Sequence, residues 1–504
     1  MLAVEMGQIQ NLVLDRPTAT SARAVVIGDE ALLLPPGLSA NETRNSLRTF
    51  LGGMPGAPFP LRALSGNTSP TLSPSPRWSE ALPQLRAIAG RVTSWKISGD
   101  GRCVPTGWLE SHSAEGRLAP VEIVASELHD LGSDVQVVMV TAVSRSPEPV
   151  TNDSMRAAGR PVLRSVSTGF DPLSTSERAL GEGIERYALG MIPADRLVHV
   201  PAIDLQESFY DPTEYLRYRK EQLTDRSIQI FDPTEDNWWV QGKRLDGRDE
   251  KVWIPAALVF APFTQIPSWT TVGVQNSSGA AFHPISTTAR ELGWRELVER
   301  DAFLRVWRGG RPIVVIEEEG RSARAKSILN ALRDTSRDTR LLVGRVQSRA
   351  SNLGVPVVIA YGPAVGICIG SCAGSGPEAL EHAALECFAQ SVMRPSASIV
   401  DPDDVLTASD HAAFFCHEDR YRLADGLLTV GRSAIHASPA LIDCHGAFVV
   451  ELELPHGVQG HAVRVIDSRL LPLTFGHGNE PLGSLAAAFE GSEFGDWSWP
   501  HPFP

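Results

Sequence analysis

Two stretches of this chain have helical periodicity and carry the same three charged residues at the same spacing. The stretches are "SERALGEGIERYALG" and "TARELGWRELVERDAFLRVW", and each contains two glutamates and an arginine in the order E-x-x-E-R. These residues are Glu182, Glu185 and Arg186 in the first stretch and Glu296, Glu299 and Arg300 in the second. Positions three and four apart share one face of a helix, so each helix presents its charges together. Thr288 and Glu291 have capping-box spacing and predict the start of the second helix.

A single motif of this kind is best explained as a solvated charged face. Both stretches are strongly apolar around the charges, however, and the arrangement occurs twice, so we expect these faces to lie near packed surface. Four clustered carboxylates with little compensating charge raise each other's pKa. A divalent cation relieves that repulsion, and Mg²⁺ favours carboxylates, water and nucleotide phosphates as ligands. The two motifs therefore indicate a magnesium–nucleotide site whose arginines meet phosphate oxygens.

A third predicted helix lies in "SGPEALEHAALECFAQSVM". Pro377 stands where a first-turn proline is expected, and Ser375 with Glu378 has capping-box spacing. Glu386 and Gln390 lie on one face of this otherwise apolar helix, where polar groups need partners. A helix edge that reaches solvent would explain these two residues equally well.

Several other kinds of site are excluded by motif. The chain contains no GxxxxGK followed by Ser or Thr, so a P-loop does not bind the nucleotide. It contains neither a GxSxG elbow nor an HExxH helix. The six cysteines form no CxxC pair, which argues against a structural zinc site or a disulfide framework. Cys416-His417 and the pair Cys368/Cys372 could ligate metal, although ordinary buried thiols explain them better.

Composition narrows the class of protein. The chain has 504 residues, of which 42% are hydrophobic, enough for a core in two or three modules. The net charge of −13 and the absence of a Lys/Arg-rich run argue against a nucleic-acid partner. The first residues lack the signal-peptide pattern, and no apolar run reaches the ~18 residues that span a membrane. We therefore expect a soluble protein of a reducing cytoplasm.

The chain is expected to have three parts. Residues 64–79 are rich in Ser and Pro and read as a linker, so residues 1–63 form a small strand-helix module for docking or peptide recognition. In it, "ARAVVIGDEALLLPPG" predicts two strands, and "SANE" begins a helix. Residues 64–87 are the linker and lead-in. In residues 88–504, runs such as "VQVVMVTAV" and "VPVVIAYG" alternate with helices, which indicates a mixed α/β body of the α+β class.

Taken together, these stretches resemble the YcaO family, whose members use ATP to modify backbone amides of peptides. The sequence from Gly169 through "FDPLSTSERALGEGIERY" is similar to the family's opening glycine turn and E-x-x-E-R. "SSGAAFHPISTTARELGWRELVERDAF" resembles N-G-x-A followed by a gapless E-x-x-E-R-D, which is the most specific block. "GSCAGSGPEALEHAALECFAQS" is similar to the block that ends in E-x-x-x-Q, and "SDHAAFF" and "HAVRVIDSRLLPLTFG" resemble late blocks. The resemblance covers roughly residues 88–504.

The last five residues, "PHPFP", add to the resemblance. Prolines at a terminus are usually part of a frayed tail. A C-terminal P-x-P-x-P is nevertheless the mark of the azoline-forming branch of the family, the cyclodehydratases, and Pro500, Pro502 and Pro504 match it. A polyproline II rod is already extended at ~3.1 Å per residue, so docking it loses little entropy. The resemblance thus implies that the Pro504 carboxylate reaches the active site, where burial raises its pKa and makes it a usable base.

The resemblance also implies an activity. A Cys, Ser or Thr side chain of a ribosomally made precursor peptide attacks the preceding amide, ATP phosphorylates the oxyanion, and loss of phosphate gives a thiazoline or oxazoline. Glutamates 182, 185, 296 and 299 would hold Mg²⁺, while Arg186, Arg300, Ser278, Glu386 and Gln390 would complete the ATP site. The implied partners are a separate E1-like or ThiF-like leader-binding protein and a flavin-dependent azoline dehydrogenase. The sequence leaves the oligomeric state open, a homodimer included.

The chain departs from the family pattern at several positions. Ser167-Thr168-Gly169 stands in place of a Gly-Lys-Gly turn, which removes a cation near the phosphates. Ser278 replaces the asparagine of N-G-x-A, His283 replaces a glycine, and Ser468-Arg469-Leu470 replaces P-G-L. Two alternatives follow: another YcaO reaction, such as thioamide or amidine formation, and a non-catalytic scaffold that binds the precursor peptide.

Overall fold

The structure is a computed structural model. It describes the backbone of five strands in residues 1–120 and, beyond them, most of the chain. The described ranges beyond residue 120 are 121–132, 135–145, 162–191, 196–225, 231–248, 250–261, 276–309, 312–348, 354–374, 376–395, 398–417, 419–427, 430–431, 444–454, 458–488 and 499–503. The chain divides into two compact units, and the second begins, apart from short connections, at Ile184.

The first unit contains two sheets. The five-stranded sheet has the order β1-β2-β3-β4-β5, with β1 (Ile9–Val13), β2 (Arg23–Ile27), β3 (Glu30–Leu34), β4 (Val92–Ile97) and β5 (Cys103–Trp108). The predicted pair of strands in residues 22–37 is confirmed as the hairpin β2–β3. The helix predicted from "SANE" and the boundaries predicted at residues 63 and 87 lie outside the described residues and stay predictions. Because β4 pairs with β3, this sheet includes strands from beyond the predicted linker.

The second sheet of this unit has the order β6-β7-β8, and it precedes the first E-x-x-E-R helix. Its strands are β6 (Val121–Asp130), β7 (Gln136–Arg145) and β8 (Val162–Gly169). The helix that follows is α4 (Pro172–Leu189), which confirms the first helical prediction. Asp171 precedes it and accepts the Ser174 N–H at 2.7 Å, as an N-cap does. Residues of α4 up to Gly183 belong to the first unit, and those from Ile184 belong to the second.

The second unit is built around two further sheets. One has the order β11-β10-β18-β19-β12, with β9 also paired to β10, and the other has the order β16-β15-β14-β13-β17. The strands of the first are β9 (Leu197–Pro201), β10 (Asp236–Arg244), β11 (Lys251–Pro255), β12 (Ala280–His283), β18 (Phe448–Leu452) and β19 (His461–Ile466). Those of the second are β13 (Ile313–Val315), β14 (Arg340–Gln347), β15 (Gly354–Gly362), β16 (Gly366–Ser371) and β17 (Val430–Gly431).

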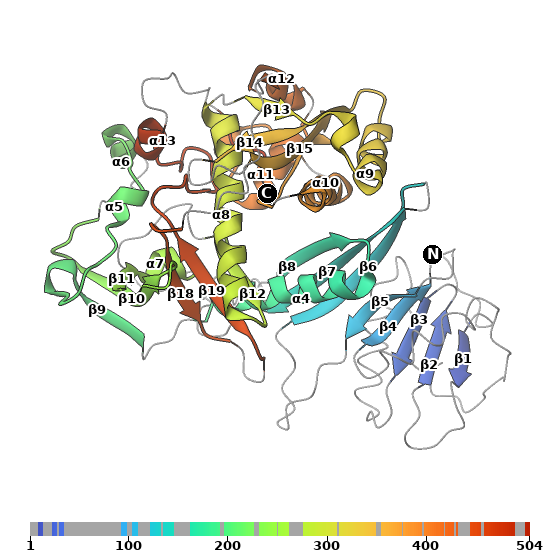
Figure 1. The fold of residues 1–504 in the computed structure, drawn as a ribbon, viewed down its shortest axis with the longest axis horizontal. Coiled ribbons are helices and arrows are strands. Elements are labelled where there is room, and N and C mark those ends of the chain that lie inside the picture. Colours follow the sequence, from blue (N-terminus) through green and yellow to red (C-terminus); the bar gives the residue numbers. More distant parts are fainter. Residues whose placement is uncertain are drawn as a thin grey trace. The chain divides into compact units, whose positions relative to one another are not determined.

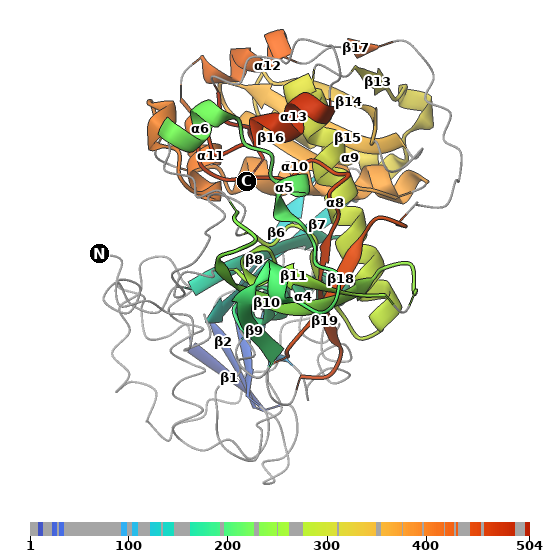
Figure 2. The same ribbon diagram turned by 90° about the vertical axis from the view of Figure 1, so that its left-hand side faces the viewer.

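The long helix α8 (Ser286–Gly309) connects these two sheets (Figure 1). It packs against β12 and β19 of one sheet and against β14 and β15 of the other. Helices α9 (Ala323–Asp334) and α10 (Pro377–Val392) contact each other and pack on β14, β15 and β16 (Figure 2). The shorter helices of this unit are α5 (Pro212–Tyr215), α6 (Lys220–Asp225), α7 (Ala256–Val259), α11 (Ala408–Phe415), α12 (Leu423–Leu427) and α13 (Leu482–Ala488). Four 3-10 turns complete it at Ala202–Asp204, Glu318–Gly320, Pro402–Asp404 and Arg420–Arg422.

One core cluster spans both sheets of the second unit. It includes Trp294, Phe303 and Trp307 from α8, together with apolar residues of β14, β15, β16 and β19. Phe503, from the proline-rich end of the chain, belongs to the same cluster and is 1% exposed. The E-x-x-E-R charges of α8 are thus placed on a helix whose other positions are packed in the core, as the apolar surroundings predict.

Two predicted helix starts are wrong. Helix α8 begins at Ser286, so Thr288 lies inside it and cannot be its N-cap; instead the His283 side chain accepts the N–H of Ile285 at 3.0 Å. The N-cap of α10 is Gly376 rather than Ser375, with a φ of 88° and no capping side chain. Pro377 is confirmed in the first turn, where its missing N–H reduces the need for a cap.

The predicted fold class is confirmed, because the described strands and helices form a mixed α+β structure with several antiparallel sheets. Among the described residues, no helix is both long enough and apolar enough to cross a membrane.

Candidate functional site

The turn before β12 is hydrogen-bonded to the second E-x-x-E-R motif. The Gly279 N–H donates to Glu296 at 2.9 Å, and the other carboxylate oxygen of Glu296 accepts from Arg300 at 3.1 Å. Gly279 has a φ of 83°, and a Cβ there would lie 2.5 Å from the Val465 carbonyl oxygen. Only glycine fits this position, because it tolerates both the left-handed backbone and the close approach of a neighbouring strand. The glycine of the motif therefore brings a backbone N–H to the Glu296 carboxylate.

Helices α8 and α10 hold strand β16 and the loop after it through three side chains. Glu299 of α8 accepts the Ala373 N–H at 2.7 Å. On α10, Glu386 accepts the Ser371 N–H at 2.9 Å, and Gln390 accepts the Ile369 N–H at 2.8 Å. The E-x-x-x-Q face thus binds the backbone of β16, and these N–H groups are the partners that its half-buried polar residues need. The structure brings Glu299 and Glu386 close enough for their carboxylates to act on each other.

The carboxyl groups of this region lie where burial and mutual repulsion disfavour their charged form. Burial, and next the nearby Glu386 carboxylate, raise the pKa of Glu299 to about 8. The Ala373 N–H and the Arg300 guanidinium act in the opposite direction but do not restore its ordinary value. Burial and the same two carboxylates raise the pKa of the Cys372 thiol. Because its pKa is about 8, Glu299 keeps a proton at neutral pH without a ligand, and a bound cation would displace that proton.

Two arginines at the site have N–H groups without an acceptor among the described residues. For Arg300 these are Nε and Nη1, and for Arg464 it is Nε. Arg464 lies on β19, is 6% exposed, and donates from Nη1 to the Asn276 carbonyl at 2.7 Å. Burial lowers its pKa, whereas Tyr215, Glu296 and Glu185 raise it. Unmet guanidinium N–H groups beside glutamates fit a ligand that carries phosphate oxygens.

Asn276 and Arg464 are residues of this site that the sequence analysis missed. The buried Asn276 donates to the Leu473 carbonyl and accepts the Ser278 N–H at 2.9 Å, so it shapes the turn that leads to Gly279. Ser278 itself is buried in this turn, at 7% exposure. An asparagine two residues before the expected position was one available signal. An arginine inside the apolar run "HAVRVID" was the other, since arginine is rarely buried without a partner.

The first E-x-x-E-R motif is placed on α4 as predicted. Glu182, Glu185 and Arg186 are each half-buried and have partners in the structure. Glu185 and Glu296 both act on Arg464, which connects the two motifs electrostatically. Glu182 belongs to the first unit, so its approach to the glutamates of α8 stays a prediction. Among the described residues, no group of three or more His, Cys, Asp or Glu side chains is arranged to hold a metal ion.

Asp301, the last residue of E-x-x-E-R-D, has a structural role. It is fully buried and accepts from Arg305 at 2.9 Å, from the Ser348 hydroxyl at 2.8 Å and from the Leu471 N–H at 3.0 Å. These partners come from α8, the end of β14 and the segment after β19. Asp301 therefore fixes the helix that carries Glu296, Glu299 and Arg300 against the strands on either side.

The proline-rich end of the chain is docked in the second unit. Residues 500–503 are buried, and Phe503 packs on Phe303 with ring centroids 5.2 Å apart. The Arg300 guanidinium lies over the Phe503 ring, 3.8 Å from its centroid. The expectation of a docked rather than frayed tail is therefore confirmed for residues 499–503. Pro504, whose carboxylate was predicted to be the base, lies outside the described residues.

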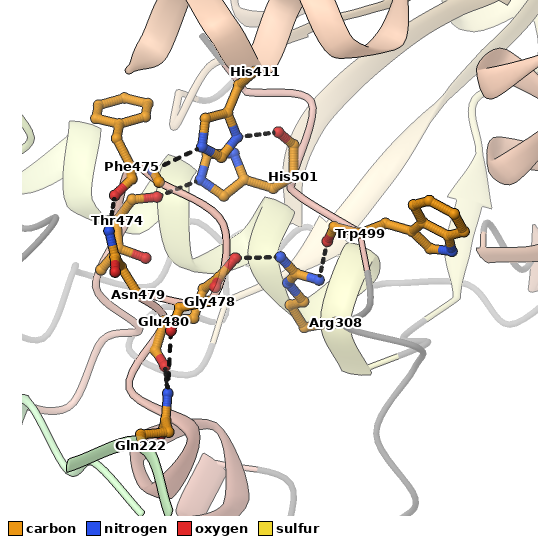
Figure 3. A network of polar contacts seen from close by, with 11 residues as sticks. Gln222, Arg308, His411, Thr474, Phe475, Gly478, Asn479, Glu480, Trp499 and His501 are labelled. Carbon is orange, nitrogen blue, oxygen red and sulfur yellow. Dashed lines mark hydrogen bonds and ion pairs between the residues drawn. The ribbon is translucent and has the colours of Figure 1, made fainter. Parts of the chain in front are cut away.

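A chain of buried polar contacts surrounds this tail (Figure 3). Arg308 donates to the Trp499 carbonyl at 2.7 Å and to the Glu480 carboxylate at 2.5 Å. His411 contacts the His501 carbonyl at 2.6 Å, and the two imidazoles stack with centroids 4.2 Å apart. His501 in turn donates to the Thr474 carbonyl at 2.7 Å.

A family profile described as YcaO cyclodehydratase, ATP- and Mg²⁺-binding, matches residues 166–440, which is more than half of the chain. The chain belongs to the YcaO family. Members of this family are ATP-dependent cyclodehydratases that bind ATP and Mg²⁺. No curated protein matches this YcaO chain.

Solved structures also show similarity. A structure described as a heterocyclase in complex with substrate and cofactor is 14% identical, with a TM-score of 0.52 over 70% of this chain and 49% of that one. This YcaO chain thus spans about half the length of that protein, and the likeness shows the fold. YcaO from Methanopyrus kandleri bound with AMPPCP and Mg²⁺ is 15% identical, with a TM-score of 0.46 over 69% of this chain and 85% of that one. The E. coli microcin synthetase McbBCD complex is 14% identical, with a TM-score of 0.48 over 71% of this chain and 90% of that one.

Proposed function

We propose that this YcaO protein is a peptide cyclodehydratase that converts Cys, Ser or Thr residues of a ribosomally made precursor peptide into thiazolines or oxazolines. The observation that carries the proposal is the position of Arg300. This residue pairs with Glu296 of the E-x-x-E-R motif and stacks on Phe503 of the docked tail. One side chain therefore connects the proposed nucleotide site with the P-x-P-x-P sequence that the azoline-forming branch shares.

The glutamates of the two motifs, Glu182, Glu185, Glu296 and Glu299, would hold Mg²⁺. The fit rests on their chemistry, since burial, and next the Glu386 carboxylate, raise the pKa of Glu299 and leave its charged form without a partner. A bound Mg²⁺ would stabilise the charged form of these carboxylates and accept oxygen ligands from the nucleotide phosphates. Glu386 and Gln390 keep β16 in place by accepting its N–H groups, which positions the backbone beside Glu299.

The cations of the site act on the phosphates of ATP. Arg300 has two N–H groups and Arg464 has one that find no acceptor among the described residues. Phosphate oxygens are suitable acceptors for guanidinium forks, and buried donors that already point into a site need little reorganisation. Arg186 and Ser278 would complete the polar surroundings. Arg464 thereby offsets the cation that is lost at Thr168, where the family pattern has lysine.

The thiol or hydroxyl of the substrate residue attacks the carbonyl carbon of the preceding amide, and its proton passes to a base. The resulting oxyanion takes the terminal phosphoryl group of ATP, and ADP is released. The C–O bond then breaks, phosphate leaves, and the amide N–H proton is lost as the C=N bond of the azoline forms. The peptide loses one water, and ATP becomes ADP and phosphate.

We assign the proton transfer to the carboxylate of Pro504. The residue before it, Phe503, is buried against Arg300, so the end of the tail is directed to the motif helix. A carboxylate in such surroundings can act as a general base when burial keeps it partly protonated near neutral pH. Adding one glycine after Pro504 would move this group while leaving the docked residues unchanged.

The proposed partners follow from the same activity. The precursor peptide is the substrate, and a separate E1-like or ThiF-like protein recognises its leader. A flavin-dependent dehydrogenase oxidises the azolines afterwards. We assign residues 1–63 to docking or peptide recognition. Processing of the peptide by the purified chain without a second protein would contradict this division of labour.

The experiment is phosphate release from ATP and Mg²⁺ by the full chain, with its precursor peptide and leader-binding protein, followed by mass spectrometry of the peptide. We expect peptide-dependent phosphate release and the loss of one water per ring. The variant Glu299→Gln should lose both, whereas Glu291→Gln, an exposed glutamate of the same helix paired with Arg295, should keep both. Peptide binding without ATP turnover would favour the scaffold alternative, and a sulfur-for-oxygen mass change would favour thioamide formation.

A further inference from the structure

The docked tail contacts the second unit through its main-chain carbonyls. The Trp499 carbonyl accepts from Arg308 of α8, and the His501 carbonyl accepts from His411 of α11. Prolines alternate with these residues at positions 500 and 502, and proline has a carbonyl but no N–H. The tail therefore presents acceptors, and the body of the protein presents donors. This complementarity needs donors that stay donors at neutral pH.

His411 meets that requirement through its tautomer. Its Nε2 accepts the Gly476 N–H at 3.1 Å, so the ring proton is on Nδ1 and points to the His501 carbonyl. Burial lowers the pKa of His411 to about 4, which keeps the ring neutral in the physiological range. The His501 ring stacks on it and donates to the Thr474 carbonyl. The tail carbonyl and the tail side chain are thus both held at one position (Figure 3).

The second donor is the guanidinium of Arg308, which donates to two acceptors. One amino group donates to the Trp499 carbonyl and the other to Glu480, and both side chains are buried, at 1% and 7% exposure. The main-chain carbonyl of Glu480 accepts from Gln222 of α6 at 2.8 Å, which fixes the acidic partner in turn. Lysine would keep the charge but not the planar fork. The Glu480 pair thus orients Arg308 toward the tail.

These contacts leave the tail only one register. The donors face residues 499 and 501, and Phe503 fills the core between Phe303 and Arg300. A slip by one residue would take the Phe503 ring out of the core and place a proline against Arg300. We propose that Arg308 and His411 are positioning residues for the reaction, which set the register of the tail so that its end meets the E-x-x-E-R helix. This inference rests on the proposed function and names residues that act through the tail.

The test uses the full chain and four variants. Arg308→Lys keeps the charge but breaks the planar fork between Glu480 and the tail. His411→Phe removes the Nδ1 donor to the tail, and His411→Asn restores an N–H near the place of Nδ1. Arg290→Lys is the matched control, because Arg290 lies on the same helix and pairs with Glu451, away from the tail. Three quantities are measured: hydrogen exchange at the amides of residues 499, 501 and 503, the melting temperature, and kcat with KM for ATP.

We expect Arg308→Lys and His411→Phe to speed exchange at these amides about tenfold or more, since each opens the docked tail. We expect kcat to fall about tenfold or more with KM for ATP nearly unchanged, because misplacement of a catalytic group affects the chemical step. His411→Asn should restore part of the slow exchange and part of kcat. Arg290→Lys should match the wild type in both quantities.

Three outcomes would overturn the inference. Unchanged exchange in Arg308→Lys and His411→Phe would show that these donors do not hold the tail. Faster exchange with an unchanged kcat would show that the register does not matter for the reaction. A lower melting temperature with normal exchange and kcat would reduce both residues to structural ones. The exchange measurement needs no turnover, so it still decides whether the tail is held if the wild type proves inactive and the proposed function fails.

Discussion

Two buried polar regions of the second unit balance their charge in different ways. Around Glu299 and Glu386, carboxylates accumulate and the pKa of Glu299 rises to about 8. Around the tail, Arg308 has its own carboxylate in Glu480, and the buried His411 is neutral. The first region would gain a partner from a bound cation, whereas the charges of the second are paired within the chain. We infer that the first is built to receive a ligand and the second to hold a segment still.

This difference has a physical reason. A buried charge that lacks a partner costs stability, so a protein keeps one where a ligand will supply the partner. A buried ion pair with satisfied hydrogen bonds adds little net stability but fixes a geometry. The acidic region should therefore respond to Mg²⁺ and nucleotide. The stability of the tail region should change when its packing changes, and it should not change when Mg²⁺ or nucleotide binds.

The largest effect on stability should come from the tail region. Phe503→Ala removes a ring that is 1% exposed and packed on Phe303 and Arg300. We expect the free energy of unfolding to fall by about 3 kcal/mol, as for other buried aromatic residues cut to alanine. Denaturant unfolding of the full chain measures it. Phe503→Leu should recover most of the loss, and a loss below about 1 kcal/mol would mean that the tail is not part of the core.

The acidic region should show the opposite pattern. Glu299→Gln should reduce ATP turnover by about 10²- to 10³-fold, a size typical for the loss of one charged group that stabilises the transition state. Its stability at pH 7 without ligands should not fall, because the substitution removes a carboxylate that burial and Glu386 disfavour. Steady-state kinetics and thermal unfolding of the same sample test both parts. A strongly destabilised Glu299→Gln would show that this residue is structural.

The pH dependence of stability separates the regions further. Glu299 has its pKa raised from 4.5 to about 8 in the folded chain, so the unfolded chain releases this proton first as pH rises. Its favourable contribution is fully present below pH 4.5 and is lost by about pH 8. We expect Glu299→Gln to flatten the decline in stability over that range. Added Mg²⁺ with a non-hydrolysable ATP analogue should also flatten it in the wild type, with proton release on binding.

The smallest effect should appear at acid pH and involve the tail. The pKa of His411 is lowered from 6.5 to about 4, so the unfolded chain binds a proton that the folded chain does not. The stability from His411 is present above pH 6.5 and is lost as pH falls through about 4. His411→Asn should lose part of this slope, and His501, whose pKa is also lowered, should retain the rest. An unchanged slope would mean that His411 is protonated or exposed in the folded protein.

Much of this architecture can be read from the sequence. Period and spacing locate α4, α8 and α10, and the repeated E-x-x-E-R on apolar helices indicates charged groups near the core. The alternation of prolines predicts a tail that can dock at low entropic cost. These features are local, so a window of a few residues contains the information.

The features that local pattern does not reveal depend on distant partners. Asn276 and Arg464 matter because a turn and a strand far apart in sequence meet there. Arg308 and Glu480 form a buried ion pair although they lie 172 positions apart in the sequence. At the start of α8 the His283 side chain accepts the Ile285 N–H, whereas Thr288 lies inside the helix. Such contacts are set by tertiary packing, which overrides local propensity.

The central claim is that the amide oxygen of the peptide is phosphorylated. The direct measurement uses a precursor peptide with oxygen-18 in the amide that precedes the reactive residue, with full-length protein, partner, ATP and Mg²⁺. The account predicts that each ring formed transfers one labelled oxygen to the released phosphate. Ring formation with unlabelled phosphate and labelled water would contradict it, because the oxygen would then leave without having been phosphorylated.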